Sequence, residues 1–292
     1  MKDFDLAFSK EKDSVEKIIY SYCPKEVGKQ SLIFEAMNYS LKAGGKRLRP
    51  ILMLETFKLF GEDEEKAYPF MAAIEFIHTY SLVHDDLPAM DDDEFRRGQK
   101  TTHAKYGEDI GILAGDGLLN MAYEIMSDAA LRDPSSSKAM SVIAKKAGSY
   151  GMVGGQTVDV INEGKKLDLD TINFIHNLKT AALIEASMMG GAILGGASES
   201  QLDEVEQIAK NIGMAFQIQD DILDVTGDEK KLGKPVLSDE KNEKDTYITL
   251  IGLEESKGKV EELSNKAIDG IKALGDNEFL VSLVEKLINR EY

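Results

Sequence analysis

The chain contains 292 residues, and 42% of them are hydrophobic, which is enough for a sizeable core. Its net charge of −17 argues against nucleic acid and anionic membrane surfaces as partners, so any anionic substrate must be held by local cations or by metal. The single cysteine, Cys23, rules out an intrachain disulfide and is typical of a reducing compartment.

The sequence has no segment typical of export or of a membrane span. Residues 1–13, MKDFDLAFSKEKD, contain acidic side chains and lack the apolar core of a signal peptide. The most apolar run, 181–196, is interrupted by Glu185 and is shorter than a membrane-spanning helix. We therefore expect a cytoplasmic protein that does not insert stably into a membrane.

Strand patterns are almost absent, whereas apolar residues recur at helical spacing along the chain. The predicted helices cover 3–21, 30–42, 47–60, 64–87, 101–106, 110–131, 135–153, 171–194, 201–224, 244–251, 256–273 and 277–290. Glycine, proline and Asp/Ser clusters separate them, and no repeat or linker marks a boundary. The sequence predicts an all-α protein of about a dozen helices that forms one domain, residues 1–292.

The first polar motif in chain order is GGKRLRP, residues 44–50. Lys46, Arg47 and Arg49 place three cations next to two glycines, and Pro50 suits the first turn of the following helix. Cations at a glycine-rich helix start are well placed to bind an anion. A solvated basic turn is the alternative, but in an acidic chain with two aspartate motifs we favour the anion site.

The second motif, HTYSLVHDDLPAMDDDEFRRG, occupies residues 78–98. Its acidic side chains are Asp85, Asp86, Asp91, Asp92, Asp93 and Glu94. Carboxylates this close repel one another unless cations lie among them, and Mg²⁺ is typically held by one or two carboxylates together with substrate phosphates. A solvated acidic loop is the alternative. We favour the metal site, because His78, Ser81 and Asp85 share one face of an otherwise apolar helix.

A second acidic helix follows at residues 213–228, GMAFQIQDDILDVTGD. Asp220 and Asp224 are four residues apart, and Gln217 lies on the same face. Two aspartate motifs about 130 residues apart, each on an apolar helix, are far more specific than one. The long polar segment 226–244 comes directly after the second motif, and its position suits a lid.

The dipeptide His84–Asp85 raises a different possibility, a metal-dependent phosphohydrolase with a His-Asp pair. Such sites usually need several histidine ligands. The chain has four histidines and no second His-rich cluster, so we interpret His84 as a packing or hydrogen-bonding residue.

Together with LAGDGLL (113–119), GMVGGQTVD (151–159), Lys179–Thr180 and GKP (233–235), these motifs resemble the trans-prenyltransferases, or polyprenyl diphosphate synthases, of the isoprenoid synthase fold. The first aspartate motif, DDLPAMD, is similar to the longer form found in bacterial farnesyl diphosphate synthases. The resemblance implies one polyprenyl synthetase domain, a helical bundle around a central cavity, and a homodimer.

The resemblance also implies a reaction between two isoprenoid diphosphates. Dimethylallyl or geranyl diphosphate is expected to bind through Mg²⁺ ions between the aspartate motifs. Three such ions are expected when the diphosphate is bound. Metal and cations neutralise the diphosphate as it leaves, and the alkene of isopentenyl diphosphate attacks the allylic cation to give farnesyl diphosphate. The proton passes to the departing diphosphate, so no protein nucleophile is needed.

Specific residues take roles by the same resemblance. The implied metal ligands are Asp85 and Asp91, with Asp86 as a further candidate, and Asp220, with Asp221 and Asp224 assisting. Gln156 and Asp159 are expected to order metal-bound water. The expected substrate-binding residues are Gly45, Lys46, Arg49, His78, Arg96, Arg97, Lys179, Thr180, Gln217, Lys234 and Lys244.

The two diphosphates are expected to bind in separate pockets. Isopentenyl diphosphate is assigned to Lys46, Arg49, His78 and Arg97. The allylic diphosphate is assigned to Arg96, Lys179 and Lys234, with Lys244 as a further lysine over it. The expected catalytic residues are Lys179, Thr180, Gln217 and Lys234, since the oxygens of Thr180 and Gln217 can stabilise the cation.

Product length is expected to depend on Tyr80 and Ser81, which precede Asp85 by five and four residues. A large side chain at the floor of the tunnel stops elongation by excluded volume. On an ideal helix Tyr80 lies roughly 140° from Asp85 and Ser81 about 40° from it, so Tyr80 as a plain core aromatic is the alternative.

Other functions remain as alternatives. A geranylgeranyl diphosphate synthase would share the family. A terpene cyclase would share the fold, but it normally carries a different second metal motif and does not need GGKRLRP. A non-catalytic partner subunit would usually have lost one aspartate motif, and a structural acidic bundle would need neither.

Overall fold

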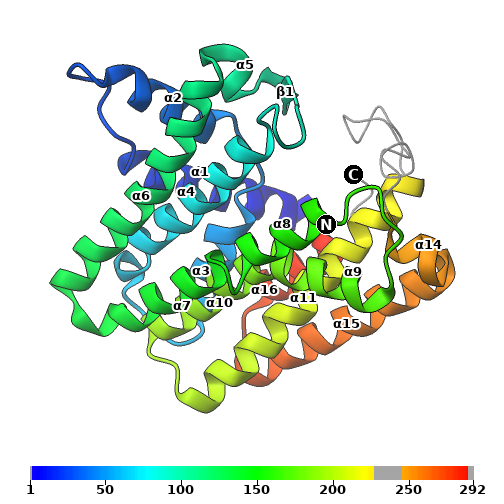
Figure 1. Ribbon diagram of the computed structural model, residues 1–292. Helices are drawn as coiled ribbons and strands as arrows, with labels where there is room; N and C mark the ends of the chain where they lie inside the picture. Colours follow the sequence, from blue (N-terminus) through cyan, green and yellow to red (C-terminus); the bar gives the residue numbers. More distant parts are fainter. Residues whose placement is uncertain (1, 227–244, 289–292) are drawn as a thin grey trace. The chain divides into compact units, whose positions relative to one another are not determined.

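The computed structural model describes residues 2–226 and 245–288, and within these residues the chain is almost entirely helical (Figure 1). The α-helices are α1 (Lys2–Ser21), α2 (Ser31–Lys42), α3 (Leu48–Lys58), α4 (Tyr68–Asp85), α5 (Thr102–Tyr106), α6 (Glu108–Arg132), α7 (Ser137–Ala147), α8 (Met152–Ile161), α9 (Leu169–Ile175), α10 (Ala182–Gly195), α11 (Glu199–Thr226), α14 (Tyr247–Ile251), α15 (Leu253–Leu274) and α16 (Glu278–Ile288). The all-α prediction is confirmed.

Shorter elements complete the described chain. Two 3₁₀ turns, η1 (Glu64–Lys66) and η2 (Pro134–Ser136), precede α4 and α7, and a π-helix, η3 (His176–Ala181), lies between α9 and α10. Two short antiparallel strands, β1 (Phe95–Arg96) and β2 (Gln99–Lys100), follow the first acidic motif.

The chain divides into two compact units. The first comprises Met1–Leu54 and Asp63–Met140, and the second Glu55–Glu62 and Ser141–Tyr292. The single domain predicted over residues 1–292 stays a prediction. No helix within the described residues is both long and apolar enough to cross a membrane.

The first unit is built on α4, which packs along α6 (Figure 1). Pro69 suits the first turn of α4, and Phe70, Ile74 and Phe76 are fully buried, so this helix is apolar on nearly every side. A Cβ on Gly115 of α6 would collide with the imidazole of His84, so glycine lets the two helices approach closely there. The consequence is that the acidic motif begins at the end of a rigid core helix.

The second unit is built on α11, which packs against α10 and α15. Ile218 and Ile222 of α11 form a buried cluster with Tyr247 of α14 and with Val260 of α15. The apolar face of α11 thereby fixes the opposite, acidic face that carries Asp220.

The helix predicted over 135–153 is wrong, because the chain breaks between α7 and α8. Gly151 adopts φ −138° and ψ −126°, and a Cβ at this position would collide with the carbonyl of Lys146. Only glycine permits this tight turn. Helical periodicity continues across the turn, so the sequence pattern did not reveal the start of α8 at Met152.

The helix predicted over 171–194 is continuous but not uniform. It contains the π-helix η3, in which one extra residue widens the turn that carries Lys179 and Thr180. Such insertions are frequent at functional sites. The hairpin of β1 and β2 was also not predicted, because its strands are only two residues long. Its turn residues, Arg97 and Gly98, have φ +53° and +77°, as in a type I′ turn.

Candidate active site

The first acidic motif folds back onto the end of α4. The backbone N–H of Asp91 donates to the carbonyl of Asp85 at 2.8 Å, and that of Asp93 donates to the carbonyl of Asp86 at 3.2 Å. These bonds close a loop over Leu87–Met90, so the additional residues of DDLPAMD are taken up in a turn. The loop brings the backbones of Asp85 and Asp91, which sequence analysis expected to act together, into direct contact.

Carboxylates at this position need cations. The C-terminal end of α4 carries the negative end of the helix dipole, which disfavours acidic side chains there. Arg96 of β1 supplies one cation, since its Nε and Nη2 lie 2.7 Å and 2.6 Å from Oδ1 of Asp86. Asp86 is buried, and burial raises its pKa above the ordinary value, against the lowering effect of Arg96. Arg96 therefore balances Asp86, whereas Asp85 is half-buried and Asp91 is exposed.

The donor set suits a metal shared with phosphate. Hard carboxylate oxygens, as on Asp85 and Asp91, are what Mg²⁺ prefers, and the ion usually keeps several positions for water and substrate phosphates. Within the described residues, no group of three or more His, Cys, Asp or Glu side chains is arranged to hold a metal. The oxygens of this loop fit Mg²⁺ on the condition that a phosphate completes its coordination.

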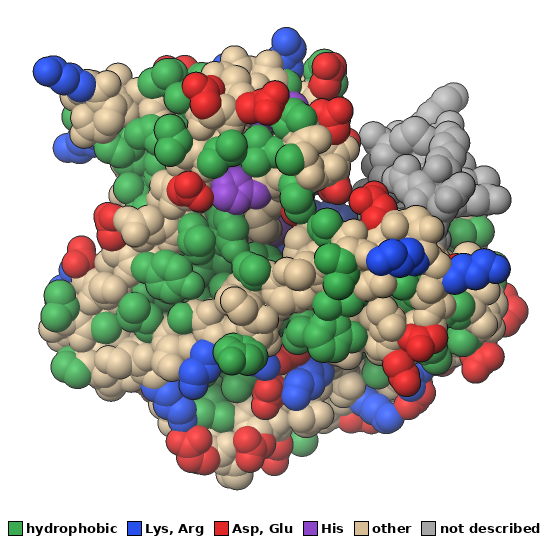
Figure 2. Space-filling view, viewed as in Figure 1, with side chains coloured by type: hydrophobic (Ala, Val, Ile, Leu, Met, Phe, Trp, Pro, Cys, Tyr) green, Lys and Arg blue, Asp and Glu red, His purple; other side chains and the backbone are tan. Residues whose placement is uncertain are grey.

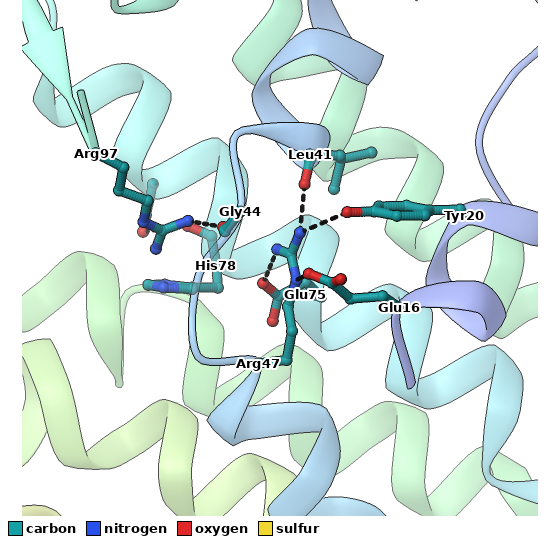
Figure 3. A network of polar contacts seen from close by, with 9 residues as sticks. Glu16, Tyr20, Leu41, Gly44, Arg47, Glu75, His78 and Arg97 are labelled. Carbon is teal, nitrogen blue, oxygen red and sulfur yellow. Dashed lines mark hydrogen bonds and ion pairs between the residues drawn. The ribbon is translucent and has the colours of Figure 1, made fainter. Parts of the chain in front are cut away.

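Arg49 and Arg97, together with His78, form a cationic cluster in the same unit, between the glycine-rich loop and the hairpin turn (Figure 3). Arg97, at the turn of the hairpin, donates through Nη1 to the carbonyl of Gly44. A Cβ on Gly45 would lie only 2.7 Å from that same Nη1, so Gly45 provides the space that the guanidinium occupies. Gly45 was expected to bind substrate, and in the structure it makes room for Arg97. Lys46, next in the loop, is exposed.

The charges and the unpaired donor of this cationic cluster favour binding of an anion. Nε of Arg49 is buried and has no hydrogen-bond partner among the described residues. Burial lowers the pKa of Arg49 to about 10, with Glu75 opposing this effect and Arg97 adding to it. His78 has its pKa lowered well below the usual value by burial and by Arg49 and Arg97, so its imidazole is neutral at pH 7. A bound anion would relieve the repulsion among these cations and satisfy the unpaired donor.

In the second unit a chain of polar contacts joins η3 to its neighbours. Lys179 Nζ lies 2.6 Å from Oδ2 of Asp159 on α8, and Thr180 Oγ1 donates to Oε1 of Gln217 on α11 at 2.8 Å. Nε2 of Gln217 lies 3.4 Å from Oδ1 of Asp221. All five side chains line a pocket of about 200 Å³. Lys179, Thr180, Gln217, Asp159 and Asp221 were all expected at a site, and the structure brings them together.

Asp221 has a structural task as well. Its side chain is buried, and Oδ2 accepts the backbone N–H of Tyr247 at 3.0 Å, at the start of α14. Asp224 is also buried, whereas Asp220 is half-buried. Among the three acids of this motif, the exposed fraction therefore singles out Asp220 as the one most accessible to a ligand.

His176, for which the sequence indicated no role, lines the same pocket. Its ring stacks on Tyr247, with centroids 5.5 Å apart and planes 20° from parallel. Burial lowers its pKa to about 4, so the ring is neutral. Its spacing of three residues from Lys179 places both on one face of a helical turn, and that spacing could have revealed it.

Gly155 shows why α8 carries a glycine opposite η3. A Cβ on Gly155 would collide with the backbone N of Lys179, so we expect Gly155→Ala to push η3 away from α8 and to destabilise the fold by about 1–3 kcal/mol. Chemical denaturation would measure this change. Gly258→Ala on α15 meets no atom within 4 Å and should instead stabilise slightly. Equal stability of the two variants would contradict this account of the packing.

The two residues associated with product length lie on α4. Tyr80 is buried, and its ring meets the ring of His84 edge to face, with centroids 5.8 Å apart and planes at 81°. Burial raises the pKa of Tyr80 to about 12, with Tyr123 of α6 contributing. Ser81 donates its hydroxyl to the carbonyl of His78 at 2.9 Å. Tyr80 therefore packs against His84, which itself lies against Gly115 of α6.

One further expected residue, Gln156, lies in the described chain, and the others lie outside it. Gln156 is half-buried on α8, the helix that also carries Asp159. Lys234, Lys244, the GKP motif and all of the lid expected over 226–244 except Thr226 lie outside the described residues.

Comparison with known proteins gives consistent matches over most of the chain. The sequence model of the family described as polyprenyl synthetase matches residues 30–282. A geranylgeranyl diphosphate synthase of Cyanophora paradoxa is 43% identical over 96% of this chain and 94% of its own length. A farnesyl diphosphate synthase of Geobacillus stearothermophilus is 45% identical over 86% of each chain.

A solved structure has the same fold. It is a geranyltransferase of Helicobacter pylori complexed with magnesium and isoprenyl diphosphate. It superimposes with a TM-score of 0.84 at 30% sequence identity, and the match covers 97% of this chain and 95% of that one.

Proposed function

Because the chain belongs to the polyprenyl synthetase family of prenyltransferases, we propose that it condenses isopentenyl diphosphate head to tail with dimethylallyl or geranyl diphosphate to give farnesyl diphosphate. The observation that carries this proposal is the presence of two kinds of anion-binding chemistry in the first unit. The loop after α4 offers carboxylates for a metal–phosphate complex, whereas the cluster of Arg49, His78 and Arg97 offers cations and an unpaired donor.

This division suits the chemistry of the condensation. One diphosphate must leave its carbon atom, and the other must stay attached. Metal bound at the aspartate motifs would neutralise the diphosphate that leaves. The cationic cluster of Arg49, His78 and Arg97 would hold the other diphosphate by direct hydrogen bonds and leave its carbon–oxygen bond intact. The related Helicobacter pylori geranyltransferase, complexed with magnesium and isoprenyl diphosphate, supports Mg²⁺ as the metal.

We propose Asp85 and Asp91 as the metal ligands of the first motif and Asp220 as that of the second, since these carboxylates are the more exposed members of each motif. Asp86, Asp221 and Asp224 are buried, and we propose that they assist. Three ions with bound diphosphate stay our expectation for the loaded enzyme.

The residues around η3 orient the allylic substrate. Lys179 binds the diphosphate that leaves, and its present partner, Asp159, holds the ammonium group until substrate arrives. Thr180 and Gln217 direct side-chain oxygens into the pocket, where they stabilise positive charge on the allylic carbon atoms. The widened π turn allows Lys179 and Thr180, adjacent in sequence, to line the same pocket.

We also propose a length for the product, fifteen carbons. Relatives named for fifteen-carbon and for twenty-carbon products are similarly close in sequence, so their names do not choose between the two. We favour the fifteen-carbon product because the buried ring of Tyr80, packed against His84, fills space close to the first aspartate motif. A geranylgeranyl diphosphate synthase is the second candidate.

A direct assay tests the proposed reaction. The full chain is incubated with Mg²⁺, labelled isopentenyl diphosphate and either allylic primer, and the dephosphorylated products are separated by chromatography. We expect a linear fifteen-carbon alcohol. A cyclic hydrocarbon would indicate a terpene cyclase, and absence of any product would indicate a non-catalytic subunit or a structural protein.

Substitutions in the two pockets should have separable effects. Arg49→Ala and Arg97→Ala should raise KM for isopentenyl diphosphate about tenfold or more, because a hydrogen bond to a charged group contributes about 1.5–3 kcal/mol. Lys179→Ala should chiefly affect the allylic substrate. Titration of each substrate at saturating concentrations of the other measures this difference. A uniform effect of all three substitutions on both substrates would argue against separate pockets.

We also propose that the chain forms a homodimer. Ile112 and Leu113 of α6 are 47% and 53% exposed, and hydrophobic side chains are visible over the surface of this part of the molecule (Figure 2). Exposed apolar side chains that are adjacent on a helix are typical of an interface. Sedimentation velocity should give a dimer, and Leu113→Glu should shift it toward monomer. A monomeric wild-type chain would overturn this proposal.

A further inference from the structure

Arg47 of GGKRLRP points away from Arg97 and into a network of polar contacts with Glu16, Tyr20, Leu41 and Glu75 (Figure 3). It is 3% exposed, and its guanidinium is engaged on every side by residues of α1, α2 and α4. Nη1 lies 2.6 Å from Oε1 of Glu75, and Nε lies 3.0 Å from Oε1 of Glu16. Nη2 donates to the hydroxyl of Tyr20 at 3.1 Å and to the carbonyl of Leu41 at 2.7 Å.

The backbone around Arg47 would not hold its shape without these contacts. Gly44, Gly45 and Arg47 have φ of +87°, +137° and +52°, so three of four consecutive residues lie in the left-handed region. Such a conformation costs a residue with a Cβ about 1–3 kcal/mol and persists only where the surroundings impose it. The buried guanidinium imposes it at Arg47.

The loop of residues 44–47 determines the backbone positions from which the cationic side chains extend. The carbonyl of Arg47 accepts the N–H of Ile51 at 3.2 Å and so begins α3, whose first turn carries Arg49. The carbonyl of Gly44 accepts from Arg97 and so connects the loop to the hairpin. Lys46 lies between these two anchors. Movement of residues 44–47 would therefore displace all three cations.

The ion pair also contributes electrostatically. Burial lowers the pKa of both Arg49 and Arg97, and the carboxylate of Glu75 opposes this lowering in each case. A buried ion pair contributes little net stability compared with apolar residues of similar size. Its retention at this position is better explained by the geometry that it imposes.

We propose that Arg47, paired with Glu75, is a positioning residue that fixes residues 44–47 so that Lys46, Arg49 and Arg97 converge on one diphosphate. This inference rests on the proposed function, because it takes that diphosphate to be part of isopentenyl diphosphate. Arg47 itself does not touch the substrate.

The test measures binding of isopentenyl diphosphate to the full chain by calorimetry, without metal or allylic substrate. Arg47→Lys keeps the charge but cannot reach Glu75, Glu16, Tyr20 and Leu41 together. The double variant Arg47→Met/Glu75→Leu removes the pair without leaving a buried carboxylate. Both variants should bind at least tenfold more weakly than wild type, while KM for the allylic substrate changes less than about twofold.

The matched control is a second ion pair with a buried carboxylate, half-buried Lys146 with buried Glu185, in the other unit. Lys146→Met/Glu185→Leu removes charges of the same kind, and its affinity for isopentenyl diphosphate should stay within about twofold of wild type. A purely structural role of Arg47 would lower the melting temperature of its variants without this selective loss of affinity.

The outcomes separate the two proposals. Wild-type affinity in both Arg47 variants would overturn the positioning role and leave the proposed function standing. Failure of the wild-type chain to bind isopentenyl diphosphate would overturn both. Loss of cooperative unfolding in both Arg47 variants would also overturn the inference, since the pair would then be a requirement of folding.

Discussion

Replacing Asp85 with alanine should lower turnover by about a hundredfold to a thousandfold, the effect typical of removing one group that stabilises charge in a transition state. Asp85 is the last residue of α4, and its carbonyl accepts a hydrogen bond from the N–H of Asp91. The backbone that carries its carboxylate is therefore held in place. The substitution removes the side chain and leaves that backbone contact in place. The loss should therefore appear in catalysis rather than in folding.

Steady-state kinetics at increasing Mg²⁺ concentration would measure the effect, and Asp220→Ala should show a loss of similar size. Glu94→Ala is the matched control, because it removes an exposed carboxylate from the same acidic segment and should change turnover less than about twofold. Turnover close to wild type in Asp85→Ala at saturating Mg²⁺ would contradict the assignment of the metal.

Much of the helical architecture could be predicted from apolar periodicity. The helices expected over 110–131, 201–224 and 256–273 correspond to α6, α11 and α15 within a few residues at each end. Periodicity works for these helices because each buries one continuous face. It does not reveal a tight glycine turn such as the one at Gly151, where the apolar pattern continues through the break.

The family was also predictable, since it depends on the order of several motifs, and the match over residues 30–282 confirms it. The different roles of residues within one motif were harder to predict from sequence. Lys46, Arg47 and Arg49 are chemically similar in sequence, and only the tertiary contacts of Arg47 with Glu16 and Glu75 distinguish it from its neighbours.

The acidic motifs have the same ambiguity. Asp220 and Asp221 are adjacent carboxylates, yet Asp221 is buried and accepts the N–H of Tyr247, whereas Asp220 is half-buried. The distinction depends on a helix 26 residues further along the chain. Local sequence carries no information about that partner. The pairing of Asp86 with Arg96 similarly depends on a short hairpin that was not predicted.

Replacing Tyr80 with alanine should change the main product from fifteen carbons to twenty or more. The buried ring of Tyr80 on α4 packs against His84, and His84 lies against Gly115 of α6. Its removal leaves a cavity beside the helix that ends in Asp85, and a close-packed interior closes such a cavity only in part. A longer prenyl chain could then extend into this space.

Tyr80→Phe is the control, because it keeps the ring and removes only the hydroxyl, so its product should stay at fifteen carbons. Both variants are assayed by chromatography of dephosphorylated products under conditions where the substrates are in excess. Tyr80→Ala should also lose stability by about 3–5 kcal/mol, as for other large-to-small changes of buried aromatic residues. If active Tyr80→Ala still releases only the fifteen-carbon product, the ring is a core residue, and the limit on length belongs to the face of α4 that carries Ser81.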